Sequence, residues 1–84
     1  MLEQLIAFAE QGNQHKIICS TPSGKPSEYQ GWIMEITEDA LLISTGFGDK
    51  SGKDVWIQFE QLKNAQFYYW NHQQGEWQAF TIQN

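Results

Sequence analysis

The residues of this chain that could perform nucleophilic or acid–base chemistry are few and widely separated. Its two imidazoles belong to His15 and His72, and its single thiol belongs to Cys19. A catalytic cysteine or serine needs a general base within hydrogen-bond reach, and no motif brings these groups together. The neighbours Ile17 and Ile18 predict an inert strand cysteine, and both histidines are expected to be solvated loop residues. The sequence therefore predicts a protein that is not an enzyme.

Metal and phosphate motifs are incomplete in the same way. Ser23-Gly24-Lys25 lacks the leading glycine, the Gly-Lys-Ser/Thr ending and the following helix of a phosphate loop. Asp49-Lys50-Ser51-Gly52 lacks the spacing of a calcium loop, and Glu38-Asp39 reads as a pair of turn acids. A single cysteine provides neither an intramolecular disulfide nor a zinc cluster. We expect no metal and no cofactor.

Charge argues against a nucleic-acid partner. The 84 residues carry a formal net charge of −5, from ten acidic residues and five lysines, with no arginine. Arginine is the usual residue for bidentate contacts to phosphate and guanine, and an acidic surface repels the phosphate backbone. The sequence favours self-association, or else a protein or peptide partner, over nucleic acid.

The N-terminus does not resemble a targeting or membrane segment. It carries Glu3 in place of a basic region, and its apolar run stops at Ala9. This is too short and wrongly charged for a signal peptide or a membrane span. We expect a cytoplasmic protein without membrane contact.

Periodicity predicts one short helix followed by strands in a single domain covering residues 1–84. Leu2, Leu5, Ile6 and Ala9 recur at helical spacing, which predicts a helix over residues 2–11 that ends near Gly12. The predicted strands are Gln14–Thr21, Glu28–Ile36, Ala40–Thr45, Asp54–Phe59, Ala65–Trp70 and Glu76–Ile82.

The second strand is expected to bend. Its apolar parity switches between Ile33 and Ile36, which indicates a bulge near Met34–Glu35, and Gly31 suits a crowded bend. Bent strands of this kind are typical of a small antiparallel barrel of five or six strands. We expect the barrel over about residues 14–70, the helix packed on it, and a hairpin strand over about 76–82.

Residues 2–70 resemble the Sm-like branch of the SH3-like small β-barrels. The matching features are the N-terminal helix, Gly31-Trp32-Ile33 followed by Ile36, the turn into Ala40–Ser44 and the corner Glu60-Gln61-Leu62. The resemblance implies a barrel and ring-like or edge-strand assembly. Members that grip RNA place Asp and Asn where this chain has about Thr37 and Leu41. Their basic-residue–glycine pair is missing from Ile57–Leu62, so the RNA pocket is not carried over.

Aromatic side chains are more numerous than so small a core can hide. The chain has four Trp, three Tyr and five Phe, and Trp is rarely buried completely. If Val55 and Ile57 face inward, Trp56 faces outward, and Trp32 is expected outward as well. These two rings would flank the central strand and form one apolar patch. The N-terminal helix, a subunit or partner, or a small ligand or peptide would cover this patch.

The C-terminal aromatics suggest an assembly surface. The strand Phe67–Trp70 is apolar on both faces, and the last strand carries no Pro or Lys to block edge pairing. We therefore expect a homo-oligomer with Trp70, Trp77 and Phe80 at or near the contact. Together the candidate binding or interface residues are Trp32, Trp56, Tyr68, Trp70, Trp77 and Phe80.

The function expected from the sequence is a non-catalytic small-barrel module for assembly or protein interaction. One alternative is an Sm-like protein that binds RNA or single-stranded DNA by aromatic stacking. The other alternative is an SH3-like domain with a peptide groove lined by Trp and Tyr.

Overall fold

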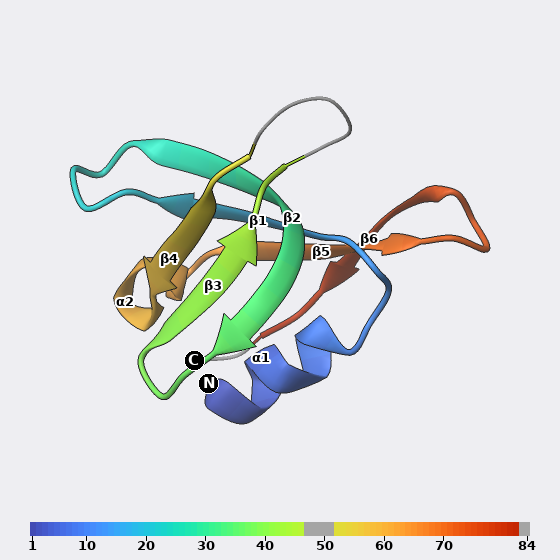
Figure 1. The fold of residues 1–84 in the computed structure, drawn as a ribbon, viewed down its shortest axis with the longest axis horizontal. Coiled ribbons are helices and arrows are strands. Elements are labelled where there is room, and N and C mark those ends of the chain that lie inside the picture. Colours follow the sequence, from blue (N-terminus) through green and yellow to red (C-terminus); the bar gives the residue numbers. More distant parts are fainter. Residues whose placement is uncertain (47–51, 83–84) are drawn as a thin grey trace.

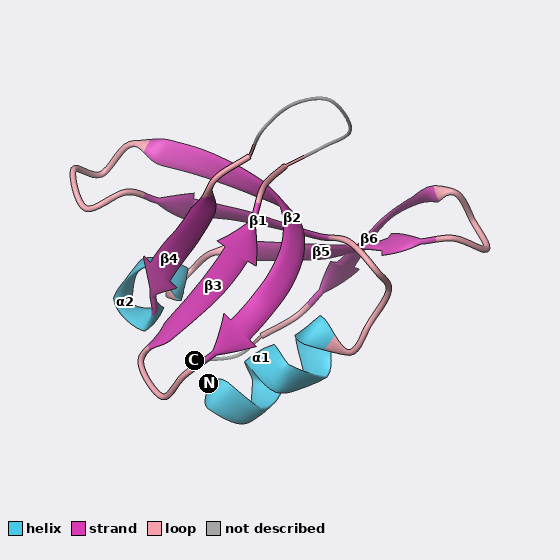
Figure 2. Cartoon of the chain, in the orientation of Figure 1, coloured by secondary structure: helices cyan, strands magenta, loops and turns pink. Residues whose placement is uncertain are grey.

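The computed structural model describes residues 1–46 and 52–82. The calcium-loop comparison at Asp49-Lys50-Ser51 therefore lies outside the described residues. The elements are the helices α1 (Leu2–Ala9) and α2 (Phe59–Leu62) and the strands β1 (His15–Ser20), β2 (Pro26–Ile36), β3 (Ala40–Ser44), β4 (Asp54–Gln58), β5 (Gln66–Asn71) and β6 (Glu76–Phe80). Figure 1 shows their arrangement, and Figure 2 shows that strands dominate it. The prediction of a mainly β chain with one short N-terminal helix is confirmed.

All of the strands belong to one antiparallel sheet. Its order is β4-β3-β2-β1-β5-β6, so β4 and β6 are the two edges. No ladder joins these two edges within the described strands, and the sheet is not closed. The structure thus shows a bent open sheet, and closure into the expected barrel is not observed. The expected hairpin from β5 into β6 is confirmed by the pairs Phe67–Phe80 and Trp70–Trp77.

The bend in β2 lies where the apolar parity predicted it. The register of β2 against β3 shifts between Ile33 and Glu35, so Met34 is the extra residue of a bulge. A Cβ on Gly31 would lie 1.8 Å from the carbonyl oxygen of Ser44. The backbone of β3 therefore crosses Gly31 more closely than any side chain allows, which explains glycine at this position.

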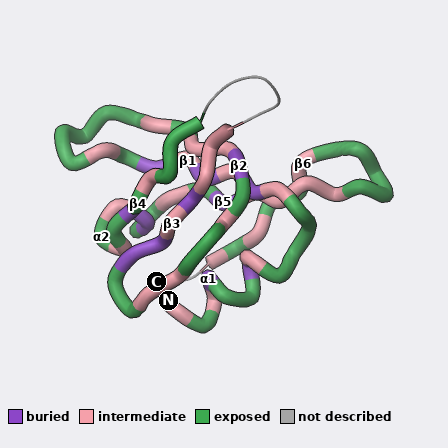
Figure 3. Tube along the Cα trace, in the orientation of Figure 1, coloured by how far each residue is buried: buried purple, intermediate pink, exposed green. Residues whose placement is uncertain are grey.

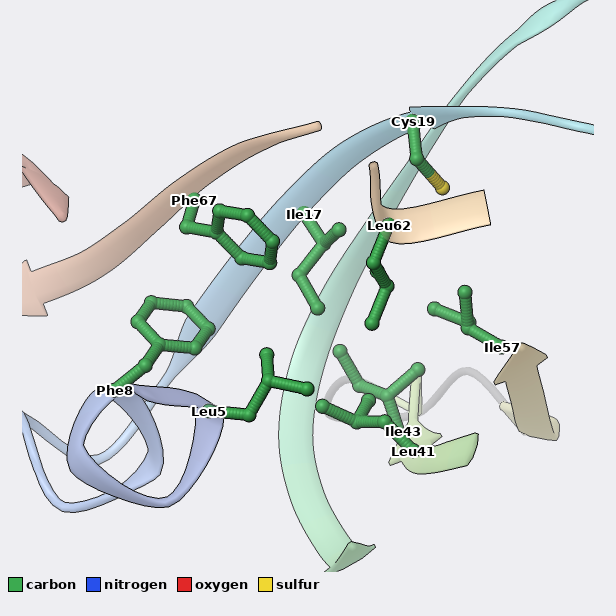
Figure 4. Close-up of a cluster of buried hydrophobic side chains, with 9 residues drawn as sticks. All are labelled: Leu5, Phe8, Ile17, Cys19, Leu41, Ile43, Ile57, Leu62 and Phe67. Atoms are coloured by element: carbon green, nitrogen blue, oxygen red, sulfur yellow. The ribbon is translucent and has the colours of Figure 1, made fainter. Parts of the chain in front are cut away.

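Helix α1 closes the concave side of the bent sheet and completes the core. Leu5 and Phe8 are fully buried and point toward Phe67, Ile17 and Ile43 (Figure 4). The buried cluster consists of Leu5, Phe8, Ile17, Cys19, Leu41, Ile43, Ile57, Leu62 and Phe67. In Figure 3 the buried segments are stretches of the strands and of α1. An isolated helix this short is unstable in water, so its packing on the sheet stabilises it.

The ends of the elements differ from expectation by one or two residues. Helix α1 ends at Ala9, before the expected Gln11, and Gly12 lies beyond it with a φ of 63°. The corner expected at Glu60-Gln61-Leu62 is the single turn α2, which begins with a capping box between Gln58 and Gln61.

Candidate functional site

The sheet has an inner face, which packs on the core, and an outer face, which points away from it. Side chains alternate between the two faces along each strand, and residues paired across strands share a face. Ile17 is paired with Phe67, and Ile57 with Leu41, and all of them are buried. These pairs define the inner face, and the residues between them define the outer face.

All four tryptophans of the chain lie on the outer face. Trp32 is paired with Ser44 and Trp56 with Leu42, each one residue out of phase with the buried positions of the same strands. Trp70 is paired with Trp77. Tyr69, the residue before Trp70, lies on the inner face with buried Phe67, so Trp70 lies on the outer face. Within the described residues, the buried cluster is consequently built from Leu, Ile, Phe and Cys side chains and contains no tryptophan.

One group of outer-face residues lies on β2, β3 and β4, and we call it the Trp56 patch: Trp32, Met34, Leu42 and Trp56. Trp32 is 37% exposed, Met34 62% and Trp56 47%. Helix α1 does not cover this patch, because its buried residues Leu5 and Phe8 pack into the core on the opposite face. Covering by the helix, one of the alternatives that the sequence left open, is therefore excluded.

A second group lies on β1, β5 and β6, and we call it the Trp77 cluster: Lys16, Tyr68, Trp70 and Trp77. The rings of Trp70 and Trp77 meet edge to face with centroids 5.4 Å apart. The Nζ atom of Lys16 lies 4.7 Å from the centroid of Trp77 and 5.1 Å from that of Tyr68. These distances are within the range of cation–π attraction. The cluster is thus an internal example of a cation held by the aromatic rings of this face.

The two groups belong to one continuous surface. The backbone N–H of Trp70 donates to the carbonyl oxygen of Gln14 over 3.0 Å. Gln14 precedes β1, and extending the register of β1 by one residue places it between Trp32 and Trp70. Trp32, Gln14, Trp70 and Trp77 therefore form a row across neighbouring strands.

Phe80 is the one candidate residue that the structure separates from the others. It is paired with Phe67 on the inner face. Its ring lies 5.4 Å from that of Phe8 and 6.5 Å from that of Tyr69, between ring centroids. Phe80 thus extends the core under helix α1, while Trp70 and Trp77 lie on the other side of the same hairpin.

His15 is not the solvated loop residue that the sequence suggested. It is the first residue of β1, is only 3% exposed, and donates from Nε2 to the carbonyl oxygen of Phe8 over 3.1 Å. Burial lowers the pKa of this imidazole, against the opposing effect of the Gln11 and Phe8 carbonyls. His15 therefore ties the end of α1 to the sheet. Its shared parity with Ile17 and Cys19 was the sequence signal for its burial.

The other group with possible chemistry is also structural. Cys19 is 6% exposed, and burial raises the pKa of its thiol, which lowers the fraction of reactive thiolate. Within residues 1–46 and 52–82, no three His, Cys, Asp or Glu side chains come together in a way that could hold a metal ion. His72 is exposed in the β5–β6 turn, where its Nε2 lies 3.2 Å from Nδ2 of Asn13.

Comparison of the chain with protein-family models, with curated proteins and with solved structures found no match. Neither described helix has the length and apolar character needed to cross a membrane. The outer-face aromatics are therefore the feature from which a function is proposed.

Proposed function

We propose that this chain is a non-catalytic module that binds a protein partner through the outer face of its sheet. The observation that carries the proposal is the position of the tryptophans, all of which lie on the face away from the core. Trp and Tyr, together with Arg, are enriched at the energetic centres of protein interfaces. The Trp56 patch is a group of neighbouring exposed apolar side chains, and such groups commonly mark interaction sites.

A protein partner is favoured over a nucleic acid by the charges of the surface. Among the described residues, Lys16 is the lysine that the register places among the outer-face aromatics, and its ammonium group lies over Trp77 and Tyr68. Glu28, Glu35 and Asp54 lie on the same face and are exposed. A phosphate backbone would meet these carboxylates without arginine to compensate. Stacking of single-stranded bases on the tryptophans is therefore the less favoured alternative.

Self-association is a second candidate, and the edges of the sheet favour it. Strand β6 is an edge strand whose residues 76–80 include neither Pro nor Lys, the residues that commonly prevent pairing with another chain. Light scattering tests assembly, since a monomer has a mass of 9.7 kDa and an oligomer a multiple of it.

We propose that the chain is an Sm-like or SH3-like small barrel. The N-terminal helix, the bent β2 and the corner at α2 support this proposal.

The experiment that tests partner binding compares outer-face variants as bait in a lysate of the source cells. The variants are Trp32→Ser with Trp56→Ser, and Trp70→Ser with Trp77→Ser. The control is Ile6→Ser, which removes an apolar side chain that is 43% exposed on α1. We expect a protein that co-purifies with the wild type and with the control, and is lost with at least one double variant. Equal recovery with every variant that keeps a folded circular dichroism spectrum would contradict the proposal.

A further inference from the structure

The surroundings of the Trp56 patch suggest the chemistry of the partner, and this inference rests on the proposed function. Two rows of paired residues cross β2, β3 and β4 on the outer face. The first row is Trp32–Ser44–Asp54, and the second is Glu35–Leu42–Trp56. Each row ends in one indole ring and one carboxylate, in opposite order. Each of these two rings therefore has an acidic neighbour on its own strand: Glu35 for Trp32 and Asp54 for Trp56.

Strand geometry sets the size of this arrangement. The two ends of a row lie two strands apart, about 9.5 Å between Cα atoms, and Asp54 and Trp56 lie about 6.7 Å apart along β4. Leu42 and Ser44 form the floor between them. Glu35 and Asp54 are exposed, as are Met34 and Trp56. An extended segment that runs along either row would therefore contact one indole ring and one carboxylate.

Lysine and arginine side chains match both kinds of group. Their aliphatic stems pack on apolar surface while the charged end remains polar. The charged end is attracted to the face of an indole and to a carboxylate. The Trp77 cluster provides the example within the same face, where the ammonium of Lys16 lies 4.7 Å from the ring centroid of Trp77. The net charge of −5 attracts a cationic partner at longer range.

We propose that the Trp56 patch binds an extended segment of a partner protein that is rich in lysine or arginine. The stems of the cationic side chains lie against Trp56 and Met34, and their charged ends reach Glu35 and Asp54. A second copy of the chain is a poorer occupant, because it brings another net charge of −5 against the same carboxylates. Single-stranded RNA is poorer for the same reason.

The test is a titration of the full chain with a synthetic peptide that alternates Arg and Ser, followed by tryptophan fluorescence at low and moderate salt. The control peptide has Glu in place of Arg. Trp56→Ser tests the ring, and Glu35→Gln with Asp54→Asn tests the carboxylates. Glu3→Gln with Glu10→Gln is the matched control, because it makes the same change in net charge at exposed acids on and beside α1.

We expect the Arg/Ser peptide to bind and the Glu/Ser peptide not to bind. The carboxylate variant should weaken binding about tenfold or more, the factor that a charge-assisted hydrogen bond supplies. Trp56→Ser should weaken binding by several fold, and the variant at Glu3 and Glu10 by much less than either. Circular dichroism shows whether each variant remains folded.

Three results would overturn the inference: absence of peptide binding, equal weakening by both pairs of carboxylate substitutions, or tighter binding of a single-stranded RNA than of the Arg/Ser peptide. Recovery of a cellular partner that depends on Trp56 while the peptide fails to bind would reject the cationic segment and leave the proposed function standing. Loss of both would reject the outer face as a binding surface.

Discussion

Replacing Gly31 with alanine should destabilise the fold through one steric contact. The added Cβ would lie 1.8 Å from the carbonyl oxygen of Ser44, 2.8 Å from its carbonyl carbon and 3.0 Å from Cα of Thr45. All three atoms belong to backbone, so no side-chain rotation can relieve the overlap. Gly31 is not among the described glycines with positive φ, and the expected cost is therefore steric and not conformational.

The magnitude follows from the overlap. Overpacking by a methyl group costs about 1–3 kcal/mol and occasionally more. Because β3 must move by more than an ångström here, we expect the upper end, about 3 kcal/mol. For a domain of this size that corresponds to a fall in Tm of roughly 12–24 °C. This is a large part of a total stability expected to be about 4–13 kcal/mol for a chain of this length.

Gly24→Ala is the matched control for thermal unfolding followed by circular dichroism. Gly24 has a φ of 87°, and a Cβ there would meet nothing within 4 Å. Its substitution should cost only the backbone strain of a left-handed residue, about 1–2 kcal/mol. A Gly31→Ala variant that melts at or above the Tm of Gly24→Ala would show that β3 does not cross Gly31 at this distance.

Three further predictions concern the buried residues. Phe8→Ala should cost about 3–5 kcal/mol in urea unfolding, since the ring is fully buried against Phe67 and His15; a loss below about 1 kcal/mol would mean that α1 contributes little to the core. The free energy of unfolding should fall as the pH drops below the ordinary histidine pKa of 6.5, because the folded pKa of His15 is lowered and the unfolded chain then binds more protons; His15→Gln should remove this slope and His72→Gln should retain it. Cys19, which is 6% exposed, should react slowly with a maleimide in the native protein and rapidly in urea, and equal rates would place its thiol at the surface.

Local periodicity was sufficient for the strands and for the bend in β2. The switch of apolar parity between Ile33 and Ile36 is a local signal, and the register shift that it predicts lies between Ile33 and Glu35. A local signal of this kind does not predict whether the barrel closes. Closure depends on the summed curvature of all the strands, which determines whether the edges β4 and β6 meet, and no short segment encodes that sum.

The candidate site could be predicted in part. The clean alternation of Val55, Trp56 and Ile57 correctly placed Trp56 on the outer face. The run Phe67–Trp70 has aromatic residues at both alternating positions, so its pattern does not indicate which of them face the core. Packing of Phe67 against Phe8 on α1, with ring centroids 5.4 Å apart, determines which side chains of this strand face the core. This contact is distant in sequence, so the strand pattern alone does not indicate which face is the inner one. Alternation along β6 does separate Trp77 from Phe80, which lie three residues apart, and the expectation that both lie at one contact disregards that local signal.

The most direct test of a binding role for the outer face is an ¹⁵N spectrum of the protein, recorded free and with the partner that co-purifies with it. Each of the four tryptophans gives its own indole N–H signal, and all of their rings are on the outer face. Binding through this face predicts large shifts in the indole signals of Trp32 and Trp56, with little change in the backbone amides of Leu5 and Phe8. Shifts confined to α1, with unmoved indole signals, would contradict it.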